Sequence, residues 1–90
     1  MALKNIKTAT TTLVTTGQGS IASITLNNNA GISGTQTIAI YDGIDATGTL
    51  LGTIGVTSAT PPVNLPLWWN FKVGVCIVTS GTNDLTVNVQ

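Results

Sequence analysis

Apolar and polar residues alternate along most of this chain, and this period of two predicts β-strands. Between residues 20 and 27, for example, Ala22, Ile24 and Leu26 share one face, while Ser, Thr and Asn occupy the other. No stretch of a dozen residues has the three-and-four spacing of an amphipathic helix. Thr, Val and Ile recur throughout, and their branched side chains favour the pleated surface of a sheet. The pattern therefore predicts an all-β protein.

Clusters of Gly, Asn, Pro and Asp divide the alternating segments into seven or eight expected strands. These cover residues 3–9 and 11–16 (two short strands or one long one), 20–27, 35–42, 50–57, 63–77 (two strands joined near residue 70 or 72) and 85–89. Strands with one apolar face bury it by packing two sheets together. We therefore expect a single antiparallel β-sandwich domain spanning residues 1–90, with a jelly-roll-like strand order and an immunoglobulin-like order as the alternative.

The phase of each strand separates the expected core from the expected surface, because neighbouring side chains point to opposite faces. Ile38 and Ile40 are expected to face inward, and Tyr41 outward. Further along, Leu50 is expected to share its phase with Ile54, since both occupy even positions of one strand.

The adjacent residues Trp68 and Trp69 cannot both enter the same core. Phase places Trp69 inside with Phe71 and leaves Trp68 outside with Pro66. An outward Trp is a candidate for a contact with another protein or for stacking against a sugar, and the alternative is that it lies flat under a loop of its own chain. Pro66 lacks an N–H donor, so its strand is expected at a sheet edge or beside a bulge.

The composition narrows the classes of function. The chain is 42% hydrophobic and 7% charged with zero net charge, which excludes a disordered chain. Three Lys or Arg residues are too few for a protein that binds nucleic acid by neutralising phosphates. With no His and only three acidic residues, we expect no enzyme, no metal site and no cofactor. So little charge causes little repulsion between copies, which suits a subunit of an assembly and also occurs in an adhesive or lectin-like module.

Two features that resemble chemical sites have simpler interpretations. Asp42 and Asp45 lack the spacing of a calcium-binding loop, and an Asp before Gly is typical of a turn. Cys76 has no second cysteine with which to pair, and it lies in the apolar run 73–78. We expect it to pack as a small hydrophobic residue, with a disulfide between subunits as the lesser alternative.

The first 16 residues are rich in Thr, and they are expected to form an edge strand or an arm that pairs with a neighbouring subunit. No apolar stretch follows the lysines of this start, so neither a signal peptide nor a bilayer-spanning segment is expected. The candidate contact residues are Trp68, Tyr41, Thr10, Thr12 and Val14.

Six short motifs follow one another in the second half of the chain. They are IAIYDG at 38–43, ATGTL at 46–50, LP at 65–66, FKVG at 71–74, VTSGT at 78–82 and DLTV at 84–87. Their succession resembles that of small all-β virion proteins of tailed bacteriophages. The resemblance implies a sandwich that decorates or cements a capsid, or that serves as a tail or fibre module, with no catalytic residues.

The low charge and this resemblance together predict a capsid decoration or cement protein, made in the host cytoplasm and bound to the outside of the virion. Its partner would be the major capsid protein, held by non-covalent contacts, with no nucleic acid or membrane partner. A symmetric homo-oligomer is expected, and a trimer would suit the local threefold axes of a capsid.

The alternative is a carbohydrate-binding or adhesive β-sandwich of a tail or head fibre. The surroundings of Trp68 distinguish the two functions. A sugar site needs Asn, Asp or Gln beside the ring, whereas a protein contact needs an apolar patch with a polar rim.

Overall fold

The computed structural model describes residues 2–27, 33–81 and 84–90, which form eight strands. The strands are β1 (Ala2–Ile6), β2 (Thr10–Thr16), β3 (Gly19–Leu26), β4 (Gln36–Asp42), β5 (Thr49–Val56), β6 (Val63–Phe71), β7 (Gly74–Thr79) and β8 (Leu85–Val89). The described residues contain no helix that is long and apolar enough to cross a membrane.

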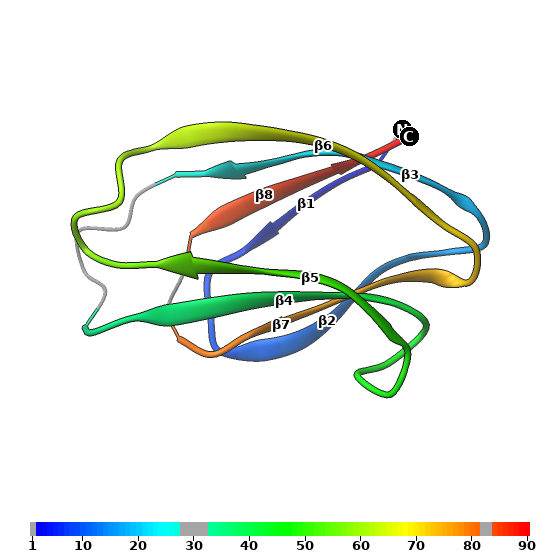
Figure 1. Ribbon diagram of the computed structural model, residues 1–90, viewed down its shortest axis with the longest axis horizontal. Helices are drawn as coiled ribbons and strands as arrows, with labels where there is room; N and C mark the ends of the chain where they lie inside the picture. Colours follow the sequence, from blue (N-terminus) through cyan, green and yellow to red (C-terminus); the bar gives the residue numbers. More distant parts are fainter. Residues whose placement is uncertain (1, 28–32, 82–83) are drawn as a thin grey trace.

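The strands form two four-stranded antiparallel sheets, in the orders β1-β8-β3-β6 and β2-β7-β4-β5. Figure 1 shows the first sheet in the upper half of the molecule and the second in the lower half. The chain is therefore a β-sandwich, as its alternating pattern predicts.

The strand order is that of a jelly roll. The pairs β1–β8, β2–β7, β3–β6 and β4–β5 are those of one long hairpin whose two arms run the length of the chain. The hairpin then rolls up, so that β8 also pairs with β3 and β7 also pairs with β4. In the immunoglobulin-like alternative the first strand pairs with the second, whereas here it pairs with the last.

The two inner faces make one apolar core of β-branched and leucine side chains. Its fully buried members include Ile21, Ile24, Ile38, Ile40, Val56, Val75, Ile77, Leu85 and Val87. Each such side chain contributes about 1.5–3 kcal/mol of burial free energy, so the core holds the two sheets together.

The Thr-rich start forms two strands rather than one, and they lie in different sheets. Residues 2–6 pair with β8 and residues 10–16 pair with β7, so both are edge strands of their own chain and neither is a free arm. The long alternating segment 63–77 is two strands, β6 and β7, joined at Lys72 and Val73.

Three of the four edge strands carry a β-bulge, which adds a residue to one strand of a pair. The bulges in β2 and β5 also change the phase of their strands, whereas β6 keeps its alternation of exposed and half-buried residues. In β2 the extra residue is Val14, and in β5 it is Leu51; both pack against the core. The bulge at Leu51 turns Leu50 to the outside, where it is 52% exposed, so the expectation that Leu50 shares the phase of Ile54 is wrong.

In β6 the bulge lies between Pro66 and Trp69, which are opposite Ser23 and Ile21 of β3. Pro66 is thus both on an edge strand and beside a bulge, as its missing N–H predicts.

The ring of Trp69 links the two sheets where β5 and β6 lie at their edges. Trp69 is half-buried against the core, and its ring reaches Gly52 of β5. A Cβ atom added at Gly52 would lie 2.5 Å from Cη2 of Trp69, so only glycine leaves room for the ring.

We expect Gly52→Ala to lower the free energy of unfolding by about 1–3 kcal/mol, because the Trp69 ring must move to admit a methyl group. The matched control is Gly55→Ala on the same strand, where an added Cβ would meet no atom within 4 Å. Thermal unfolding, followed by circular dichroism and tryptophan fluorescence, measures both variants. Equal melting temperatures for the two would contradict this packing.

Candidate functional site

The outer face of the β2-β7-β4-β5 sheet carries a row of apolar side chains that crosses all four strands. The register places Leu13 opposite Cys76, Cys76 opposite Tyr41, and Tyr41 opposite Leu50. The two leucines, at the ends of the row, are 46% and 52% exposed, while Tyr41 is half-buried and Cys76 is buried. We call this row and its neighbours the apolar face.

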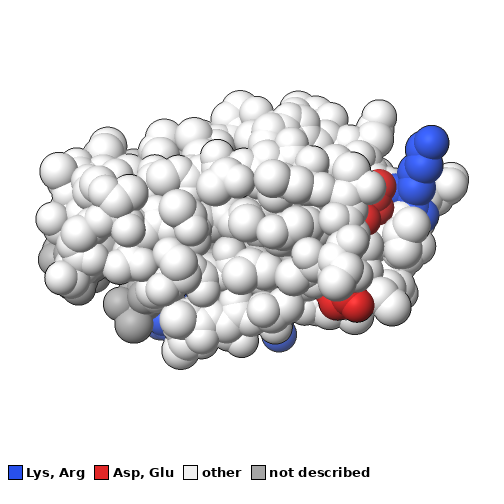
Figure 2. Space-filling view, turned by 60° about the horizontal axis from the view of Figure 1, so that its bottom comes forward, with Lys and Arg blue, Asp and Glu red and all other residues white. Residues whose placement is uncertain are grey.

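A second row borders the first on the same face. It runs Thr11, Val78, Ala39 and Thr53, with threonine at both edges and half-buried apolar side chains in the middle. Neither row contains a charged residue. Figure 2 brings forward the lower side of Figure 1, which carries β4, β7 and β2, and charged atoms appear there only toward the margins. The apolar face is thus an apolar patch whose strand residues at the rim are polar and uncharged, with the carboxylate of Asp45 close enough to act on Cys76.

Cys76 is buried within this face, between Leu13 and Tyr41 on the neighbouring strands. Burial raises the pKa of its thiol, and the negative charge of Asp45 raises it further. The thiol therefore stays protonated near neutral pH and acts as a small hydrophobic side chain, which is the role that its sequence context predicts.

The outer face of the other sheet, which we call the polar face, is a network of hydrogen bonds between uncharged side chains and one carboxylate. The amide nitrogens of Asn5 and Asn27 both donate to Oδ1 of Asp84, at 3.1 and 3.2 Å, and to Oγ1 of Thr86. Further along the face, Thr25 donates to Asn64 at 3.0 Å, so β3 and β6 are also linked.

Trp68 interrupts the polar face with a large, solvent-exposed ring. Its side chain is 64% exposed, so it does not lie under a loop of its own chain. Its backbone has a φ of +54°, the left-handed region that a bulky residue rarely enters and that costs roughly 1–2 kcal/mol. The bulge in β6 thus contains an exposed ring on a strained backbone, and such strain is typical of functional positions.

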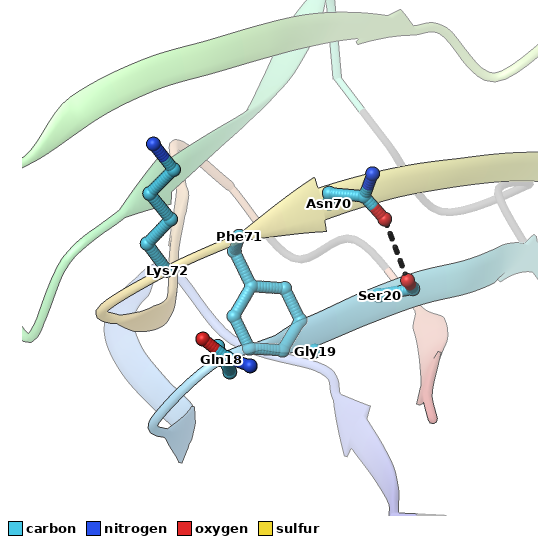
Figure 3. A pocket seen from close by; sticks show the side chains of 6 residues that line it. All are labelled: Gln18, Gly19, Ser20, Asn70, Phe71 and Lys72. Carbon is cyan, nitrogen blue, oxygen red and sulfur yellow. Dashed lines mark hydrogen bonds between the residues drawn. The ribbon is translucent and has the colours of Figure 1, made fainter.

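A shallow pocket of about 350 Å³ lies on the same side of β6, two residues beyond Trp68. Its polar lining includes Gln18, Ser20, Asn70 and Lys72, and the hydroxyl of Ser20 donates to Oδ1 of Asn70 at 2.8 Å. Figure 3 shows the ring of Phe71 between these polar groups.

Asp42 stabilises a turn far from it in sequence. Its carboxylate accepts hydrogen bonds from the backbone N–H groups of Lys72, Val73 and Gly74, at 2.9–3.4 Å, in the β6–β7 turn. These bonds, the one from Val73 above all, lower the pKa of Asp42. The carboxylate of Asp42 thus supports the distant β6–β7 turn, whereas in the loop that follows Asp42 it is Asp45 that accepts hydrogen bonds, from Thr47.

The candidate contact residues of the Thr-rich start lie in different surroundings. Thr10 is exposed, and its N–H donates to the hydroxyl of Thr79. Thr12 is half-buried opposite the core residue Ile77, and Val14 packs against the core. Val14 is therefore corrected from a surface candidate to a half-buried residue that packs on the core of its own chain. It lies on the same core-facing side as Thr12, and the β2 bulge changes the phase only of the residues that follow it.

The structure adds Leu13 and Leu50 to the contact candidates and places them on one face with Tyr41, whereas Trp68 lies on the opposite side of the sandwich. Each added leucine is next to a bulge residue. Strict alternation therefore places Leu50 on the wrong face, and it does not indicate that Leu13 and Leu50 lie on the same face. Among the described residues, no three His, Cys, Asp or Glu side chains gather to bind a metal ion.

The lowered pKa of Asp42 makes a prediction about pH. A carboxyl group with a lowered pKa stabilises the fold above its ordinary pKa of about 4, and this contribution is lost as the pH falls through the folded value. We expect Asp42→Asn to lower the melting temperature at pH 7 and to reduce its acid dependence below pH 4. The carboxyl group of Asp45, whose pKa Thr47 lowers, leaves some acid dependence in the variant. Parallel melting curves for both proteins from pH 7 to pH 2 would contradict this role.

The strain at Trp68 predicts that glycine is tolerated there. Trp68→Gly removes the strain of the left-handed backbone, which stabilises the folded state by roughly 1–2 kcal/mol. The greater freedom of glycine in the unfolded chain destabilises the fold by about 0.5–1 kcal/mol. We expect the melting temperature to stay the same or rise slightly. Trp69→Ala, its matched control, removes a ring that packs on the core and is expected to cost about 3 kcal/mol. A melting temperature lowered as much by Trp68→Gly as by Trp69→Ala would show that packing holds the Trp68 ring.

Comparison with known proteins matches this chain to no protein family, to no curated protein and to no solved structure. The two faces are therefore interpreted from their own geometry and chemistry.

Proposed function

We propose that this chain is a structural subunit of a virus particle, which decorates or cements the capsid of a tailed phage through its apolar face. The observation that carries this proposal is the row of Leu13, Cys76, Tyr41 and Leu50 across four strands, on the outside of the sandwich. A single exposed leucine needs no explanation, but two at the ends of one continuous row form a surface that gains free energy when a partner covers it.

The anatomy of the apolar face suits a protein partner. Protein interfaces have an apolar centre, few charges there and a polar rim. The half-buried Tyr41 lies within the row, and tyrosine is among the residues that contribute most to binding. The rim consists of threonines such as Thr11 and Thr53, which make hydrogen bonds without the desolvation cost of a charge.

The fold and the charge of the chain support the same function. Jelly rolls of eight strands form many viral capsid domains, although lectins and cupins share the architecture, so the fold alone does not decide. With three basic and three acidic residues, copies repel one another little when they are close together on a lattice. Many weak contacts of one kind on a repeating surface add up to tight binding.

The proposed partner is the major capsid protein. The subunit is proposed to act on the capsid exterior as a symmetric homo-oligomer. A trimer would match a local threefold axis.

Binding to capsids that lack this chain tests the proposal, with sedimentation as the measurement. We expect the full chain to sediment with the capsids of the phage that encodes it. The double variant Leu13→Asn and Leu50→Asn should bind at least about tenfold more weakly, because each lost leucine contact is worth about 1 kcal/mol.

The matched control is Leu3→Asn. Leu3 is 63% exposed, but it lies on β1, opposite Asn88, on the polar face. It should bind capsids as the unchanged chain does. Equal loss of binding by Leu3→Asn, or no capsid binding by the unchanged chain, would overturn the proposal.

A further inference from the structure

On the exposed side of β6, Trp68 lies between Pro66 and the polar Asn70. Residues 66, 68 and 70 all lie on the exposed side of β6, and Asn70 is thus about 7 Å further along the strand than Trp68. Across the strands, Pro66 is opposite Ser23 and Asn70 is opposite Ser20. On the side toward Asn70 and Ser20 the strand positions near Trp68 therefore carry an amide and a hydroxyl, whereas the surroundings of a protein-binding hot spot are usually apolar.

The pocket at Asn70, two residues beyond Trp68 along β6, has hydrogen-bonding groups that the protein does not use. Ser20 donates to Oδ1 of Asn70, and the amide nitrogen of Asn70 makes no hydrogen bond within the part of the chain that the structure describes. The side-chain amide of Gln18, which also lines the pocket, makes none there either. At the other end of the polar face, by contrast, Asn5 and Asn27 are bound to Asp84 and Thr86.

The shape of the pocket depends on Gly19. A Cβ atom added there would lie 2.7 Å from the carbonyl oxygen of Gln90 and 3.0 Å from Cζ of Phe71. The backbone of β3 thus lies against the Phe71 ring. Figure 3 shows Gln18 and Ser20 on either side of Gly19 in the chain, and Asn70 of β6 facing Ser20.

We propose that Trp68 and this pocket bind a neutral hexose of a glycan. A flat indole ring packs against the C–H face of a pyranose, as aromatic rings pack against apolar surfaces generally. The amides of Asn70 and Gln18 in the pocket can supply the directional hydrogen bonds to sugar hydroxyls that give specificity. Lys72 is the one charged residue in the pocket lining, so an anionic polymer such as a nucleic acid finds too few cations there.

This site is independent of the proposed capsid contact, because the two lie on opposite faces of the sandwich. Trp68 and Asn70 belong to the β1-β8-β3-β6 sheet, and Leu13 and Leu50 belong to the β2-β7-β4-β5 sheet. A chain attached through its apolar face would therefore turn the sugar site away from the capsid surface, where host glycans are accessible.

A printed array of glycans with terminal glucose, galactose, N-acetylglucosamine or sialic acid tests the site with the full chain. We expect binding to at least one neutral hexose. A fluorescence titration with the corresponding free oligosaccharide should then give a dissociation constant, since Trp68 is the exposed tryptophan. Trp68→Gly should weaken binding at least tenfold, and Asn70→Ala or Gln18→Ala should weaken it about threefold or more.

The matched control is Asn64→Ala, which changes an amide on the same side of β6 whose Oδ1 likewise accepts a hydrogen bond from a hydroxyl, that of Thr25, but which lies outside the pocket lining. It should leave sugar binding unchanged, and Trp68→Gly should keep its melting temperature and its capsid binding. No binding to any glycan on the array would overturn the site. Binding that Trp68→Gly leaves intact, or that is restricted to sialylated glycans and lost in salt, would also overturn it.

Discussion

The packing of the two inner faces against each other is the constraint on which the remaining structure depends, because it fixes the phase of every strand. Once Ile38, Ile40 and Ile77 are buried, their direct neighbours in the chain must face outward. Tyr41 and Cys76 take part in the apolar face for this reason, and no bond of their own holds them there. A bulge is the local device that shifts this phase. In β5 it turns Leu50 to the surface while Leu51 packs on the core, and in β3 the extra residue Ala22 lets both Ile21 and Ile24 face the core.

Local patterning predicts those features that depend on phase alone. Alternation is enough to place Trp69 inside and Trp68 outside, and the missing donor of Pro66 is enough to place β6 at an edge. It fails at Leu50, because the extra residue that reverses the phase has no distinctive side chain. The strand order and the partners of Asp42, 30 to 32 residues later in the chain, depend on pairings between distant segments, which no local pattern encodes.

The two outer faces differ in the residue types that occupy the outward-facing strand positions between the core residues. The polar face alternates with Asn, Ser and Thr, whose side chains bond to one another across β1, β8, β3 and β6. The apolar face carries Leu, Cys, Tyr and Val at the corresponding positions, and no hydrogen bond joins the side chains of Leu13, Cys76, Tyr41 and Leu50. A chain this poor in charge has no electrostatic means of choosing a partner, so hydrogen-bond geometry on one face and apolar contact area on the other must provide its selectivity.

The edge strands determine whether copies of this chain can pair edge to edge into a continuous sheet. β2 and β5 are bulged, β6 carries both a bulge and Pro66, and on β1 the exposed Lys4 lies opposite the buried Val87 and so occupies a core-side position. Each device interrupts the ladder that a further chain would need for continuing the sheet. A protein with almost no charge to keep it dispersed is thereby protected from open-ended, amyloid-like fibre growth, and its copies can crowd at high density without templating one another.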